Sequence, residues 1–132
     1  MKILVLALFL FFFAVGSASA DIIAVQDAQK SPQGVIRFFF SALHDNDAES
    51  VKLVLSPGRY DRYNKAGLWE NWLSVWRQCN PTQIGEFRAR YPQSKYDETV
   101  SVSVVYGCVN RPPFTNWIVV SRIDGKWYWD EN

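Results

Sequence analysis

Residues 31–44 carry the clearest helical pattern in the chain, because apolar side chains recur there every three or four positions. Ser31 is a favoured N-cap residue, and Pro32 is a favoured first residue of a helix. The pattern therefore predicts a helix that ends near His44. Its apolar face needs a large partner surface and is formed by Val35, Ile36, Phe39, Phe40 and Leu43.

Two further helices are predicted, over residues 48–55 and 67–78. The first follows a polar turn at residues 45–47, which can cap it, and the turn residues 56–58 end it. Between the two helices, residues 59–65 are polar and rich in tyrosine, which predicts an irregular segment or a short edge element. The second helix has a broad apolar face formed by Leu68, Trp69, Trp72, Leu73 and Trp76.

The second half of the chain is β-type, with strands predicted over residues 84–91, 99–109, 114–123 and 126–130. Asp124 and Gly125 predict a tight hairpin between the last two strands, because both residues tolerate a positive φ. Residues 110–113 predict a longer connection. A chain that is helical first and strand-rich second is typical of an α+β fold, with helices packed on one face of a curved antiparallel sheet.

The first 20 residues have the pattern of a cleavable export signal. Lys2 is followed by an apolar run over residues 3–15, and Ala18-Ser19-Ala20 is a small-x-small cleavage pattern. The run is shorter than the ~20 residues of a membrane span, so no stable membrane anchor is expected after cleavage. The sequence predicts a periplasmic or secreted product cut between Ala20 and Asp21, with residues 21–30 as a flexible N-terminal arm and residues 31–132 as one domain.

The charges of the chain are balanced. It has 14 Lys and Arg residues and 13 Asp and Glu residues, and the leader contributes Lys2 and no acid, so 13 of each sign follow it. A balanced chain is not expected to bind nucleic acid or an anionic membrane through general electrostatics.

Cys79 and Cys108 are the only cysteines, and export would carry them to a compartment in which a disulfide persists. A disulfide is therefore predicted; two buried free thiols are the alternative. His44 is the only histidine, and no residue cluster has the spacing of metal ligands, so neither a metal nor a cofactor is predicted.

Several segments are similar to the NTF2-like superfamily, which includes SnoaL-like and ketosteroid-isomerase-like proteins. They are SPQGVIRFFFSAL at residues 31–43, DND at 45–47, LVLSP at 53–57, and the closing segments WIVV at 117–120 and IDGKWY at 123–128. The resemblance implies a cone-shaped α+β fold with a bent sheet wrapped around helices. A cystatin-like or other helix-on-sheet domain is the alternative.

The resemblance also includes enzymes, such as ketosteroid isomerase and limonene epoxide hydrolase, which use buried Asp, Tyr or Arg side chains in the cone. Such chemistry needs a carboxylate tuned by an apolar pocket. Here Asp45 and Asp47 fall in a capping turn and Asp124 falls in the hairpin, so no catalytic residue is predicted. His44 beside Asp45 could form an acid/base pair or simply favour the helix dipole.

Charged residues alternate along the first predicted strand at Glu86, Arg88 and Arg90, which places them on one face. They could line an anion-selective pocket or form a solvated outer face. Alternating Arg and Tyr residues make residues 59–63 the best candidate for surface recognition, against a solvated loop. The residues of this candidate surface are Arg59, Tyr60, Arg62 and Tyr63.

The density of aromatic side chains predicts either a core built around large rings or an aromatic-lined pocket. The candidates for ligand binding are Trp72, Trp76, Tyr106, Trp117 and Trp127. The sequence therefore predicts an exported, non-catalytic binding or accessory module whose concavity takes a small apolar ligand or peptide. The alternatives are an enzyme of the isomerase or epoxide-hydrolase kind, and a protein that docks or inhibits another exported protein or forms a homodimer through its sheet.

Overall fold

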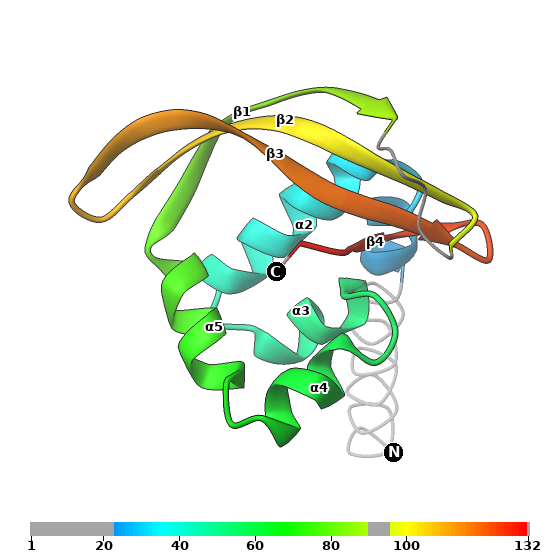
Figure 1. The fold of residues 1–132 in the computed structure, drawn as a ribbon, viewed down its shortest axis with the longest axis horizontal. Coiled ribbons are helices and arrows are strands. Elements are labelled where there is room, and N and C mark those ends of the chain that lie inside the picture. Colours follow the sequence, from blue (N-terminus) through cyan, green and yellow to red (C-terminus); the bar gives the residue numbers. More distant parts are fainter. Residues whose placement is uncertain (1–22, 90–95, 132) are drawn as a thin grey trace, which may run out of the picture.

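The computed structural model describes residues 23–89 and 96–131, in which a curved antiparallel sheet lies over a layer of helices (Figure 1). The sheet is an open meander in the order β1-β2-β3-β4. The predicted α+β class is therefore confirmed. The helices are α2 Pro32–His44, α3 Ala48–Val54, α4 Arg59–Lys65 and α5 Trp69–Arg77, and the strands are β1 Cys79–Ala89, β2 Glu98–Cys108, β3 Arg111–Ile123 and β4 Lys126–Trp129.

Helix α2 is the central support of the sheet and contacts all four strands. Its N-terminus is capped as predicted, because the Ser31 hydroxyl accepts a hydrogen bond of 3.0 Å from the backbone N–H of Gly34. The predicted apolar face is buried under the strands. After α2 the chain turns at Asn46, which has a positive φ of 57°, and Asp47 caps α3.

Residues 59–65, predicted to be irregular or a short edge element, form helix α4 instead. Gly58 adopts a φ of 81°, which lets the chain reverse and start the helix. The buried residue of α4 is Arg59. Because this residue is charged, α4 has no stripe of buried apolar positions from which a helix could be predicted.

Two strand boundaries also differ from the prediction. Strand β1 begins at Cys79 rather than at residue 84, because Pro81 lies on an edge strand, where the missing N–H is tolerated. Strand β3 begins at Arg111, so residues 110–113 are not a long connection. Only residues 120–123 of β3 pair with β4, which leaves the β3 edge open beside the two prolines that follow Arg111.

The hairpin predicted at Asp124 and Gly125 is confirmed, with φ values of 51° and 80°. The outer edge of β4 is bonded to loops: the Ser56 N–H donates to the Trp129 carbonyl, and the Trp127 N–H donates to the Gln29 carbonyl. Gln29 is buried, and residues 23–28, which the sequence places in an N-terminal arm, are helical.

The predicted disulfide is present between Cys79 and Cys108, with an S–S distance of 2.06 Å. The two residues are direct partners in the β1–β2 ladder, and Cys79 follows α5 after one residue, so the bond ties this helix to the far end of β2. Closing a loop with a sequence separation of 29 is worth roughly 3–4 kcal/mol in the chain-entropy model.

Candidate functional site

The concave side of the sheet is filled by aromatic side chains. Phe39 of α2 stacks on Trp129 of β4 with ring centroids 3.6 Å apart. Trp76 of α5 meets Trp129 edge to face at 5.1 Å and Tyr106 at 5.8 Å. Trp76, Tyr106 and Trp127, which the sequence assigns to a ligand pocket, are at most 8% exposed. These three rings belong to the hydrophobic core.

Trp72 lies on α5 at the edge of this core and is half-buried. Its ring packs against Tyr63 of α4 at 5.2 Å and against Trp69 at 5.6 Å. Its indole N–H is enclosed and has no hydrogen-bond partner among the described residues. Trp72 therefore joins α4 to α5 and does not line an open concavity.

Trp117 does not line the concavity. Its neighbour Ile118 is fully buried against the core, so Trp117 points to the opposite, outer face of the sheet, where it pairs with Ser103. Its side chain is 38% exposed. The guanidinium carbon of Arg88 lies 3.8 Å from the ring centroid, a cation–π contact across the small side chains of β2.

The charged residues of β1 do not form an anion pocket within the described structure. Arg88 crosses the outer face to Trp117, and Glu86 is exposed on the same edge strand. Arg90, the third member of the predicted set, lies outside the described residues. The exposed side chains of Glu86 and Arg88 match the solvated-face alternative.

Arg59, assigned by the sequence to a recognition surface, is only 6% exposed. Its guanidinium forms an ion pair with Asp130 at 2.7 Å and donates to the Ser56 hydroxyl at 3.0 Å. Asp130 also accepts a hydrogen bond of 2.8 Å from Ser121 of β3. Arg59 is thus a structural anchor that joins the start of α4 to the end of the sheet.

The other three members of that predicted surface are partly accessible. Arg62 is exposed, whereas Tyr60 and Tyr63 are half-buried. The ammonium nitrogen of Lys52 lies 4.1 Å from the Tyr60 ring centroid. A hydrogen bond from this ammonium to Glu49 raises the pKa of Lys52 above its ordinary value of 10.5.

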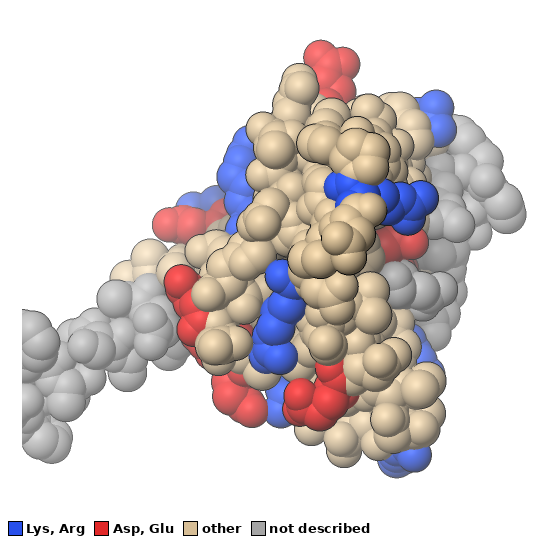
Figure 2. Space-filling model, turned by 90° about the vertical axis from the view of Figure 1, so that its left-hand side faces the viewer, with Lys and Arg blue, Asp and Glu red and all other residues tan. Residues whose placement is uncertain are grey.

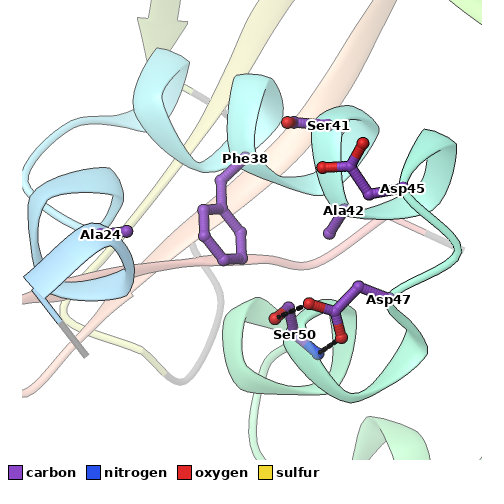
Figure 3. A pocket seen from close by; sticks show the side chains of 7 residues that line it. All are labelled: Ala24, Phe38, Ser41, Ala42, Asp45, Asp47 and Ser50. Atoms are coloured by element: carbon purple, nitrogen blue, oxygen red, sulfur yellow. Dashed lines mark hydrogen bonds between the residues drawn. The ribbon is translucent and has the colours of Figure 1, made fainter. Parts of the chain in front are cut away.

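A shallow cavity of about 130 Å³ lies between helical residues 23–28, α2 and α3 (Figure 3). Both carboxylate oxygens of Asp47 are engaged by Ser50, through its backbone N–H at 3.1 Å and its hydroxyl at 2.6 Å. These bonds lower the pKa of Asp47 below 3.8, which makes it a poor general base. The cavity is lined by Ala24, Phe38, Ser41, Ala42, Asp45, Asp47 and Ser50.

The Nε2 atom of His44, the only histidine of the chain, lies 3.1 Å from the Cys79 carbonyl oxygen, within hydrogen-bond distance. Among residues 23–89 and 96–131, no three His, Cys, Asp or Glu side chains are grouped to hold a metal ion. The same part of the chain contains no helix with the length and hydropathy of a membrane span.

Comparison with protein-family models and with curated proteins gives no match to this sequence.

Proposed function

We propose that this chain is an exported, non-catalytic module that docks another protein through its exterior. The observation that carries the proposal is the placement of the aromatic rings. Phe39, Trp76 and Trp129 fill the interior, whereas Trp117 is held on the outer face of the sheet under Arg88. The molecule therefore offers an aromatic contact to a partner outside and little room for a ligand inside.

A small apolar ligand in the concavity would have to displace packed rings. Trp76, Tyr106 and Trp127 are nearly fully buried, and burial of a large apolar side chain contributes about 1.5–3 kcal/mol. A ligand would have to recover that free energy for each ring that it moved. This cost favours the docking hypothesis over the ligand hypothesis that the sequence placed first.

The enzyme hypothesis has the weaker support. A general base on this scaffold needs a carboxylate that faces a desolvated pocket. Asp47 is held by Ser50 at a helix start, Asp130 is held by Arg59, and Glu86 is exposed. Each of these carboxylates has a structural or solvated environment that does not prepare it for proton transfer.

Export is part of the proposal and rests on the leader pattern, with the disulfide between Cys79 and Cys108 as independent support, because such bonds persist in oxidising compartments. The residues of the proposed leader lie outside the described structure. Membership of the NTF2-like superfamily is likewise proposed, and a curved sheet over helix α2 supports it without distinguishing it from other helix-on-sheet families.

Trp117 and Arg88 are residue types typical of the centre of a protein–protein interface. Trp and Arg are the residue types most enriched among those that dominate binding free energy at protein interfaces. The side chains beside this pair on β2 are small, because Ser101 pairs with Arg88 and Ser103 pairs with Trp117. A partner side chain could therefore reach the 38% of Trp117 that stays exposed beside Arg88.

The test is in-cell crosslinking from position 117. A photoreactive phenylalanine analogue replaces Trp117 in the native host, and a matched protein carries it at the exposed Asn64 of α4. We expect a discrete crosslinked protein from position 117 and none from position 64. The absence of any product from position 117, together with saturable binding of an apolar dye that quenches the core tryptophans, would refute docking and support the ligand hypothesis.

A further inference from the structure

Acidic residues are missing from two long stretches of the chain. Residues 71–85 and 99–121 contain no Asp or Glu, although both signs are equally frequent after the leader. The two stretches contain two cationic residues, Arg77 and Arg111. Charge is therefore segregated along this chain even though its total is balanced.

The fold brings the two stretches together at the end of α5. The disulfide joins Cys79 to Cys108, and the Val109 N–H donates a hydrogen bond of 3.0 Å to the Gln78 carbonyl. The Cys79 sulfur also lies 3.7 Å from the Val75 carbonyl. We call the resulting surface the stapled end; it consists of Val75, Arg77, Gln78, Val109, Asn110 and Arg111.

The stapled end exposes apolar side chains next to cations. Val75 is 52% exposed and Val109 is 63% exposed, which makes Val109 the most exposed of the large hydrophobic side chains in the described structure. Figure 2 faces this side of the molecule, where α5 and the β2–β3 turn lie. Its middle is formed mainly by uncharged residues with Lys and Arg among them, and the acidic side chains in view lie mainly toward its margins.

The two arginines lack carboxylate partners within residues 23–89 and 96–131. The Nε atom of Arg77 is buried without a hydrogen bond, and the guanidinium carbon of Arg111 lies 4.6 Å from the Phe114 ring centroid. Four other cations of the described residues do form ion pairs with carboxylates, namely Lys30, Lys52, Arg59 and Arg122. A carboxylate that approached the stapled end would find guanidinium groups that no acid of the described residues engages.

We infer that the stapled end binds an acidic segment of the partner protein, with apolar side chains between its carboxylates. The inference rests on the proposed docking function and names the chemistry of the partner. The carboxylates would pair with Arg77 and Arg111, and the apolar side chains would cover Val75 and Val109. The disulfide fixes the surface in advance, so little conformational freedom is lost on binding.

A protein segment fits this surface better than a polyanion does. Binding to nucleic acid gains affinity from many phosphate contacts, and two arginines supply few. The exposed valines would add nothing to such binding, whereas they add buried apolar area at a protein interface. Crosslinks to nucleic acid or polysaccharide from this surface would therefore contradict the inference.

The experiment places the photoreactive residue at position 109 in the native host and identifies the crosslinked peptide by mass spectrometry. We expect a partner peptide of net negative charge that contains apolar residues. Arg111→Glu and Arg77→Gln/Arg111→Gln should each lower the yield about tenfold, since they remove the charge that the partner recognises. The matched control Lys65→Glu reverses an exposed charge on α4 and should leave the yield unchanged.

Near-ultraviolet circular dichroism of each purified variant shows whether the fold is retained. A neutral or basic crosslinked peptide, or a yield that Arg111→Glu does not change, would overturn the inference. Crosslinks from position 117 without any from position 109 would refute the stapled end while leaving the docking function standing. The absence of crosslinked protein from both position 117 and position 109 would refute the docking function itself.

Discussion

The guanidinium of Arg59 lies 2.7 Å from a carboxylate oxygen of Asp130, and both side chains are almost fully enclosed. The pair joins the first residue of α4 to the residue that follows β4, across 71 positions of sequence. Arg59 also donates to the Asp130 carbonyl at 2.9 Å and to the Tyr63 hydroxyl at 3.1 Å. Helix α4 is therefore attached to the end of the sheet by a polar clamp, whereas its aromatic side chains pack on α5.

Removing one partner of this clamp should destabilise the protein strongly. Arg59→Met leaves the Asp130 carboxylate enclosed without its counter-charge, and loss of one member of a buried ion pair costs about 3–5 kcal/mol. Urea unfolding measures the change in free energy. The double variant Arg59→Met/Asp130→Asn should cost less than the sum of the two single changes, and strict additivity would contradict a coupled pair.

The Asp47 cap should make helix α3 sensitive to acid. Hydrogen bonds from Ser50 lower the pKa of Asp47 below 3.8 in the folded protein. A lowered pKa adds stability at pH values above 3.8, and this contribution disappears as the pH falls through the folded-state value. Asp47→Ala should cost about 1 kcal/mol at neutral pH.

Thermal unfolding of Asp47→Ala and the parent protein, followed between pH 7 and pH 2, measures this contribution. The difference in Tm should shrink as the medium becomes more acidic than pH 3.8. Asp45→Asn serves as the matched control, because Asp45 is an exposed neighbour in the same turn. A Tm difference for Asp47→Ala that stays constant across this range would contradict the capping role.

Local signals in the sequence were sufficient for α2 and for the last hairpin. Ser31 and Pro32 mark a helix start by their own chemistry, and Asp124 and Gly125 favour positive φ without help from the rest of the fold. Helix α4 could not be predicted in this way. Its anchor, Arg59, is buried only because Asp130 lies beside it, and that proximity arises from tertiary structure.

The positions of the candidate ligand-binding rings could not be predicted for a related reason. The sequence indicates that Trp76 is a large ring on a helix and that Trp117 is a large ring on a strand, but it does not tell which side of the sheet Trp117 faces. That depends on register: Trp117 pairs with Ser103, and Ile118 pairs with Val102 on the core side. The disulfide was predictable because there were only two cysteines to pair.

Loss of the disulfide should lower stability without changing the fold. Cys79→Ala/Cys108→Ala removes a cross-link with a sequence separation of 29, and the expected loss is roughly 3–4 kcal/mol. Unfolding in urea measures it, and the parent protein unfolded with a reductant should give a similar midpoint. An unchanged midpoint in both samples would contradict a stabilising role for the bond.

Processing of the leader should occur between Ala20 and Asp21. The intact mass of protein recovered from the exported fraction should correspond to a chain that begins at Asp21. Ala20→Lys places a charge at the small cleavage position and should leave the leader attached. An exported protein that retains Met1 would contradict the export mechanism, although it would leave the docking surfaces unaffected.

Core and surface tryptophans should respond differently to the same replacement. Trp76 is 8% exposed and contacts Phe39, Phe40, Tyr106 and Trp129, so Trp76→Ala should cost about 3–5 kcal/mol of unfolding free energy. Trp117→Ala removes a partly exposed ring and its cation–π contact with Arg88, for which about 1 kcal/mol is expected.

Urea unfolding of both variants, paired with the crosslinking yield at position 109, separates stability from docking. Trp117→Ala should leave a folded protein whose partner contact is weakened, because the ring provides contact area and not core packing. The matched variant Trp117→Phe keeps an aromatic face for Arg88 and should retain most of the yield. A loss of stability for Trp117→Ala as large as that for Trp76→Ala would place Trp117 in the core and contradict the proposed docking function.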